Sequence, residues 1–454
     1  MMADIAELSA FSEIQDRDSA MFFTGRDVYI THIRKACEGA AKNIAEGGKI
    51  TSATRLFYGA PGAGKTSLLT EIQVRARLGA FGTPVPTVID IDCEHLKQER
   101  DLVLILAKHL KKEGVFRTVS HEQASIGAHI LNILQGSLQK GQSQDPPEAT
   151  FDQLESLYTA AGTPSPILLC VDEIQTIQPE AKAMLSRLHQ GKHGLPIIPI
   201  YAGLGNSLQI LMSHNISRPV SGYIHSVGAL ADTEAQAAVT AMLDRFEVDQ
   251  RGADRDWPAT LAQQSDGWPQ HLHNAMRALA LELIRPEVNG VLAHVNPEAV
   301  FTQERRLRMR AYGWRISEML HQTKGLAAQV MHHIIKKPRD RSDVESLVLI
   351  LDQNAPTDPA RRPYSLPEGK GAEDYVDHMM RQGVLQEFHE EQADGTITDV
   401  LRCPIPSLAT FVMERGGVDP SHRPPDRAAE SPKIDDRAIK PKEEEGDDGT
   451  TLGL

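Results

Sequence analysis

The fold is decided by one stretch of sequence, Gly59–Ala60–Pro61–Gly62–Ala63–Gly64–Lys65–Thr66. It matches the pattern G-x-x-x-x-G-K-[S/T], in which glycines let the backbone curl so that its N–H groups face phosphate oxygens. A short apolar run precedes it, and a helical pattern beginning at Ser67 follows it and would add the positive end of a helix. The stretch therefore predicts a strand–loop–helix unit that binds nucleotide phosphates. Lys65 would reach the β- and γ-phosphates, and the Thr66 hydroxyl would bind Mg²⁺.

A second element, Ile167–Leu168–Leu169–Cys170–Val171–Asp172–Glu173, reads as a buried strand that delivers two carboxylates at its C-terminal end. Mg²⁺-dependent nucleotide hydrolysis needs this arrangement. Asp172 is expected to hold the metal through water, and Glu173 to orient and deprotonate the attacking water. On its own the pattern is weak, because many strands end in acidic residues that cap a helix. Together with the phosphate loop it predicts an ATPase.

Around these elements, short apolar runs alternate with longer helical patterns, which predicts an α/β fold with a parallel sheet flanked by helices. The fourth candidate strand contains Pro199, which removes a hydrogen-bond donor and predicts a bulge or an edge position. The candidate strands cover residues 53–58, 87–91, 167–172, 197–202 and 224–230.

The chain then becomes helical, with apolar residues three and four positions apart at 235–246, 257–265, 270–284 and 304–335. Two short helices, at 342–352 and 371–382, and a hairpin around Asp394–Gly395 predict a winged-helix-like module. The last segment is acidic and carries a proline pair, Lys–Glu blocks and no aromatic residues, so it is expected to be disordered. The predicted division is a nucleotide-binding domain at 1–231, a helical lid at 232–300, a helical linker and winged-helix-like module at 301–415, and an acidic tail at 416–454.

Composition excludes several classes of protein. The 454 residues are 41% hydrophobic and 24% charged, which is ordinary for a globular chain and not for a disordered or collagen-like one. The four cysteines lie far apart with no C-x-x-C pair, so neither a zinc site nor a disulfide scaffold is indicated. No apolar run is long enough to span a membrane, and the N-terminus carries acidic residues instead of a signal peptide's basic head. We therefore expect a cytoplasmic protein without membrane contact.

The formal net charge of −13 argues against a strong overall attraction to nucleic acid. The charge is uneven, however, because five arginines gather in one helical segment: Arg305, Arg306, Arg308, Arg310 and Arg315. They are candidates for contacts with DNA phosphates. The candidate recognition helix of the C-terminal module contains Glu373, Asp374 and Asp377, which would repel phosphates and favour a protein partner instead.

One further segment points to a family. Phe23–Thr24–Gly25–Arg26–Asp27, upstream of the phosphate loop, resembles the F-x-G-R box of AAA+ ATPases. More narrowly, it is similar to the branch that holds origin-recognition initiators and transposition regulators. The resemblance implies that Gly25 and Arg26 lie against the adenine of ATP, that ATP and Mg²⁺ are the cofactors, and that the protein forms homo-oligomers.

The resemblance also assigns catalytic roles by position. Asn206 is similar to the polar sensor that helps to place the lytic water, with Ser207 as the alternative. Arg218 resembles an arginine finger that completes a neighbouring subunit's site. In the lid, Gln270 stands where the family commonly has an arginine that senses the γ-phosphate, and Arg277 is a candidate substitute.

Two classes of function remain open at this point. One is an oligomeric, ATP-dependent regulator or loader that acts on DNA. The other is a nucleotide-dependent switch that recruits a protein partner without binding DNA. Replication, transposition and phage defence would all fit.

Overall fold

A computed structural model describes most of the chain. The described residues are 4–13, 22–46, 54–116, 130, 150–162, 165–178, 181–190, 194–212, 223–354, 366–367, 369–391 and 397–416. Arg218 lies outside them, as does the acidic tail after Gly416.

The centre of the molecule is a parallel sheet of five strands in the order β2-β3-β4-β1-β5. The strands are β1 (Arg55–Tyr58), β2 (Thr87–Asp92), β3 (Ile167–Asp172), β4 (Ile197–Gly203) and β5 (Ile224–Ser226). This is the α/β fold of P-loop NTPases, as the sequence predicted. The loop after β1 and the carboxylates after β3 meet at the same edge of the sheet, separated by the end of β4.

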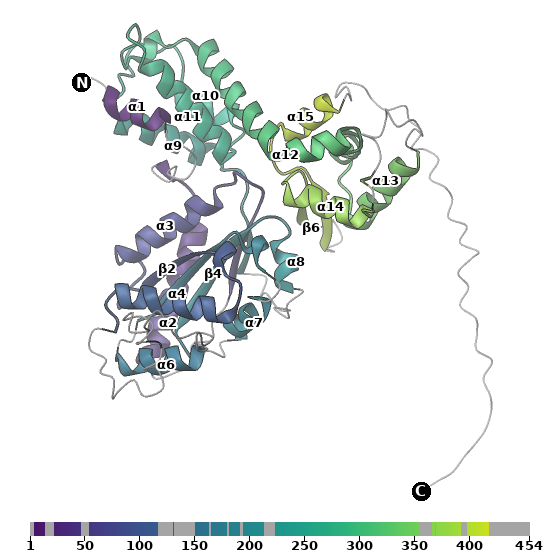
Figure 1. The fold of residues 1–454 in the computed structure, drawn as a ribbon. Helices are drawn as coiled ribbons and strands as arrows, with labels where there is room; N and C mark the ends of the chain where they lie inside the picture. Colours follow the sequence, from purple (N-terminus) through teal and green to yellow (C-terminus); the bar gives the residue numbers. More distant parts are fainter. Residues whose placement is uncertain are drawn as a thin grey trace, which may run out of the picture.

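Helices cover both faces of the sheet because its central strands are apolar on both sides. Leu168 and Cys170 of β3 pack into one hydrophobic cluster, while the alternate residues Leu169 and Val171 pack into another. The first cluster is covered by α2 (Asp27–Ala45) and α3 (Lys65–Arg77). The second is covered by α4 (Glu99–Lys112), α6 (Phe151–Ala160), α7 (Lys182–Gln190) and α8 (Ser207–Met212), which Figure 1 shows around the lower part of the molecule.

The prediction of a bulge or an edge position at Pro199 is wrong. Pro199 lies in β4, an interior strand, in regular register with Leu169 of β3. The pairing of β4 with β1 begins at Ile200, so the proline precedes it. The missing N–H of Pro199 therefore lies before the first residue of β4 that pairs with β1. The proline does not prevent β4 from pairing with both β3 and β1.

A group of helices stands above the sheet edge that carries the phosphate loop (Figure 1). It contains α9 (Asp232–Arg245), α10 (Trp257–Gln264) and α11 (Pro269–Leu283), within a few residues of the predicted lid helices. The sequence did not predict that α1 (Ile5–Glu13) belongs to the same group. Leu8 and Phe11 of α1 are buried in the cluster formed by these helices.

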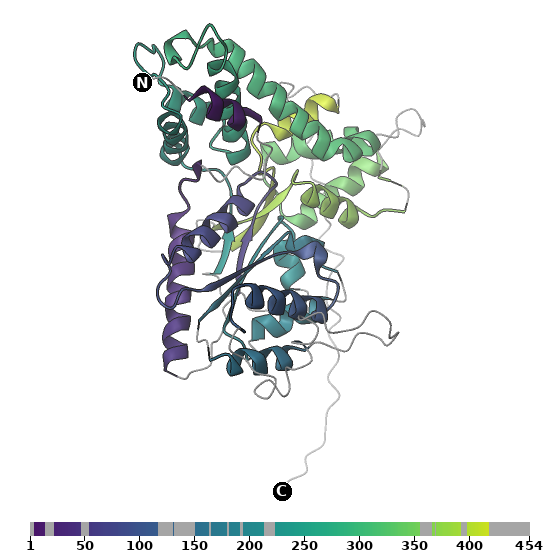
Figure 2. The same cartoon turned by 60° about the vertical axis from the view of Figure 1, so that its left-hand side comes forward.

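The long helix α12 (Pro297–Lys336) connects this group to the C-terminal elements (Figure 2). Its backbone angles are non-helical at Thr323. After it come α13 (Arg341–Gln353), α14 (Ala372–Arg381), the antiparallel hairpin β6 (Gln386–Glu391) and β7 (Ile397–Arg402), and α15 (Leu408–Arg415). Short 3-10 turns occur at Cys93–His95, Ile174–Thr176 and Leu292–His294. The division into domains and the winged-helix assignment remain predictions.

The C-terminal elements lie directly on the nucleotide-binding edge. A Cβ on Gly383, just after α14, would fall 2.3 Å from Pro61 of the phosphate loop. The Gln386 side chain of β6 donates a hydrogen bond of 3.1 Å to the Ser226 hydroxyl at the end of β5. A change at the phosphate loop can therefore reach the C-terminal elements through direct contact.

None of the helices in the described ranges is long and apolar enough to cross a membrane.

Candidate nucleotide-binding site

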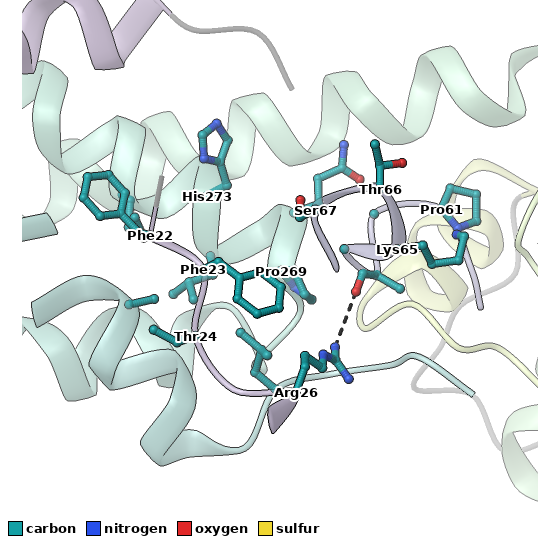
Figure 3. A pocket seen from close by; sticks show the side chains of 18 of the residues that line it. Phe22, Phe23, Thr24, Arg26, Pro61, Lys65, Thr66, Ser67, Pro269 and His273 are labelled. Atoms are coloured by element: carbon teal, nitrogen blue, oxygen red, sulfur yellow. Dashed lines mark hydrogen bonds between the residues drawn. The ribbon is translucent and has the colours of Figure 1, made fainter. Parts of the chain in front are cut away.

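A cavity of about 400 Å³ lies between the phosphate loop, the segment before α2 and the start of α11. Figure 3 shows Phe22, Phe23 and His273 towards one end, and Lys65 and Thr66 towards the other. One end is thus lined by apolar and aromatic side chains, and the other by the polar phosphate loop. Such a division suits a ligand with a flat apolar base and a chain of phosphates.

Lys65 is the buried cation of this site. Its side chain is 8% exposed, and Nζ donates hydrogen bonds to the carbonyl oxygens of Gly59 (2.9 Å) and Ala60 (3.0 Å). Burial lowers the pKa of Lys65 to about 8, while the carboxylates of Asp172 and Glu173 act in the opposite direction. A phosphate in the cavity would favour the charged ammonium, because an opposite charge nearby stabilises it.

The predicted metal ligands lie together. The Thr66 hydroxyl donates a hydrogen bond of 2.7 Å to Asp172 Oδ2. A hydroxyl and a carboxylate are the hard oxygen ligands that Mg²⁺ prefers, so the donor set fits this ion. No cluster of three His, Cys, Asp or Glu side chains suited to a metal occurs within the described part of the chain. A magnesium ion here would therefore take its other ligands from water and phosphate, as this ion usually does.

Glu173 lines the same cavity from a constrained position. Its backbone is left-handed (φ +54°), and its N–H donates to Asp172 Oδ1 at 2.8 Å. Such conformations in residues other than glycine cluster at functional sites. Burial, and then the charge of Asp172, raises the pKa of the Glu173 carboxyl, which makes it a better proton acceptor.

Gln175 holds this carboxylate, a contact that the sequence did not predict. Its side-chain amide donates to Glu173 Oε2, and its own Oε1 accepts a hydrogen bond of 3.0 Å from the Leu204 N–H. Gln175 therefore connects the candidate catalytic base with the loop that follows β4.

Arg26 supports the loop from the side of α2. Its guanidinium donates to the carbonyl oxygens of Ala63 (3.4 Å) and Gly228, and it lines the cavity. Gly25 has φ +71°, and a Cβ there would fall 2.4 Å from the carboxylate of Glu234. The positive φ strongly favours glycine at this turn, so Gly25 shapes one wall of the cavity.

The predicted sensor residues lie outside the cavity lining. Asn206 is 9% exposed, and its Oδ1 has no hydrogen-bond partner within the described residues. The alternative, Ser207, is fully buried, and its hydroxyl packs against Gly203. Neither role is tested by this arrangement, and the structure gives no account of Arg218, which lies outside the described residues.

Arg277 does not approach the nucleotide site, because its guanidinium donates to the carbonyl oxygen of Ser12 (3.1 and 2.9 Å). Besides Arg26, the cavity is lined by Arg315 of α12. The predicted five-arginine cluster is therefore divided. Arg308 pairs with the buried Glu304 at 2.9 Å, whereas Arg305, Arg306 and Arg310 are exposed.

A known protein family matches part of the first half of the chain. Residues 23–198 match the model of a family described as an AAA ATPase domain, a segment that contains the F-x-G-R box, the phosphate loop, Asp172 and Glu173. No curated protein matches the chain in sequence.

Several solved structures are similar. The Orc1 protein of Aeropyrum pernix, in complex with DNA, is 15% identical over 88% of this chain and 93% of that chain, with a TM-score of 0.43. A Walker-type ATPase of Pyrococcus abyssi is 14% identical over 83% of this chain and 95% of that chain, with a TM-score of 0.48. The Orc2 protein of A. pernix, in ADPNP and ADP complexes, is 14% identical over 84% of this chain and 92% of that chain, with a TM-score of 0.47.

Proposed function

We propose that this chain binds ATP with Mg²⁺, hydrolyses it, and uses the cycle to act as an oligomeric regulator or loader on DNA. The observation that supports ATP hydrolysis most is the contact between Thr66 and Asp172, with Glu173 in the same cavity. These residues come from two separate parts of the sequence, the phosphate loop ending at Thr66 and the end of β3 at Asp172 and Glu173, and they meet at one edge of the sheet.

Each residue has a distinct part in this proposal. Lys65 and the backbone of the phosphate loop bind and orient the phosphates, and Arg26 keeps the loop in shape. A bound Mg²⁺ would be held by Thr66 and Asp172 and would neutralise phosphate charge. Glu173 accepts the proton of the attacking water. Asn206, with Ser207 as the alternative, would help to place that water, and Arg218 would complete a neighbouring subunit's site; both roles rest on sequence position.

The DNA part of the proposal rests on the exposed side of α12. Arg306, Arg310 and Trp314 follow one another at intervals of four residues, so they lie on one side of the helix. Trp314 is 80% exposed, which is unusual for so large an apolar side chain. Arginines that reach phosphates beside an aromatic ring that can stack on a base are a common combination in nucleic-acid binding.

This surface gives a testable expectation. Changing Arg305, Arg306 and Arg310 together to Ala should weaken binding of a mixed-sequence DNA and lower the log–log salt slope by about three, one for each phosphate that an arginine no longer neutralises. The measurement is fluorescence anisotropy over a range of salt concentrations with ATP present. Changing Arg34, Lys35 and Lys42 on α2 to Ala removes the same charge elsewhere and should leave the slope unchanged.

Equal slopes for both triple variants and the unmodified protein would remove α12 from DNA binding. Absence of binding at low salt would favour the second candidate, a nucleotide-dependent switch for a protein partner. One observation supports that candidate: Glu373 and Asp374 are exposed on α14, where they would repel DNA.

A further inference from the structure

The start of α11 contacts the phosphate loop through Gln270, a residue without charge. The Gln270 N–H donates a hydrogen bond of 3.1 Å to the carbonyl oxygen of Gly62. A Cβ on Gly62, where φ is +81°, would fall 2.4 Å from Gln270 Oε1, so the Gln270 side chain lies directly on the loop. The position from which a positive charge would reach the phosphates therefore carries an amide.

A positive charge reaches the same place from another helix. Arg315 projects from α12, and its Nη2 donates a hydrogen bond of 3.0 Å to Gln270 Oε1. Arg315 lines the cavity together with Lys65, Thr66 and Glu173. Gln270, which lies against Gly62, thus holds the guanidinium at the phosphate end of the cavity, away from the apolar end at Phe22 and Phe23.

The electrostatics of the site agree with this placement. The charge of Arg315 adds to the effect of burial in lowering the pKa of Lys65, so the two cations act on the same region. Two positive charges in one partly buried cavity repel each other, and a bound polyphosphate would relieve that repulsion.

We propose that Arg315 binds the terminal phosphate of ATP from α12 and thereby reports the nucleotide state to the C-terminal elements. This inference rests on the proposed binding of ATP. Arg315 would contact the terminal phosphate as an arginine at position 270 would. It belongs to α12, however, which continues from the nucleotide site to the C-terminal elements.

The mechanical connection follows from the packing of α12. Three residues before Arg315, the Tyr312 hydroxyl lies 2.7 Å from His271 Nε2 in α11 and 2.5 Å from the carbonyl oxygen of Pro406, just before α15. Tyr312 and Phe411 of α15 also pack ring against ring, with centroids 5.5 Å apart. Loss of the terminal phosphate would remove one attachment of α12 to the site and leave its attachments to α11 and α15 in place.

The test compares the affinities for ATP and ADP, because only ATP has the terminal phosphate. In the Glu173→Gln background, which prevents turnover, Arg315→Ala should weaken ATP binding by about 10- to 100-fold and ADP binding by less than about threefold. Arg315→Gln removes the charge but keeps a donor for Gln270, so it should show the same selective loss with less disturbance of the fold. Lys336→Ala, an exposed basic residue on the same helix, is the matched control and should bind both nucleotides as the background protein does.

Isothermal titration calorimetry with Mg²⁺ gives both affinities, and thermal denaturation of each variant checks its fold. Unchanged ATP affinity in the Arg315 variants would overturn the inference, and so would an equal loss of ATP and ADP binding, which indicates a structural role. If the unmodified protein binds neither nucleotide, the proposed function itself fails, and the inference fails with it.

Discussion

Changing Glu173 to Gln is expected to lower the rate of ATP hydrolysis by about 100-fold or more while leaving ATP binding intact. Loss of a general base typically costs 10²–10⁴ in rate, roughly the range expected here. The amide keeps the shape of the side chain and can still accept the hydrogen bond from Gln175. The metal ligands Thr66 and Asp172 are untouched, so affinity should not fall.

The measurements are steady-state phosphate release and equilibrium ATP binding on the same preparation. Glu94→Gln is the matched control, because Glu94 is an exposed carboxylate in the turn after the neighbouring strand β2 and does not line the cavity. It should hydrolyse ATP as the unmodified protein does. Undiminished turnover by the Glu173 variant would show that another group accepts the proton.

Changing Lys65 to Ala should weaken ATP binding by about 100-fold or more, since each hydrogen bond to a charged group is worth about 1.5–3 kcal/mol and Lys65 is expected to reach two phosphates. The buried ammonium is also the cation that offsets Asp172 and Glu173 in the cavity. Titration with a fluorescent ATP analogue gives the affinity. Arg77→Ala, an exposed basic residue on the same helix, should bind normally.

An affinity of the Lys65 variant equal to that of the Arg77 control would contradict the role of the loop. A melting temperature close to that of the unmodified protein would confirm that any loss of binding comes from the missing charge and not from unfolding.

The fold around the phosphate loop, which the sequence predicted, depends on local patterns. The glycines of the phosphate loop have few alternative uses in a strand–loop–helix context, and β3 is apolar enough to be buried on both faces. Thr66 and Asp172 then meet because parallel strands end at one edge of the sheet. The same local argument failed at Pro199, where the pairing of neighbouring strands decided the outcome.

The remaining residues depend on packing between distant segments. Arg315 and Arg310 look alike in sequence, but the packing of α12 against α11 turns one towards the nucleotide cavity and leaves the other exposed. The sequence did contain one signal: Arg315 follows Tyr312, which is buried, by three residues, so the two side chains share one side of the helix. Gln175 was missed because its function comes from its contact with Leu204, at the end of another strand.

The central claim is that this chain binds ATP at the phosphate loop, and calorimetric titration of the purified protein with ATP and Mg²⁺ tests it most directly. We predict one saturable site per chain with a dissociation constant between about 1 μM and 1 mM, the range in which enzymes commonly bind their substrates. ADP should compete for that site. The absence of saturable ATP binding throughout that concentration range, in a protein shown to be folded, would contradict the account.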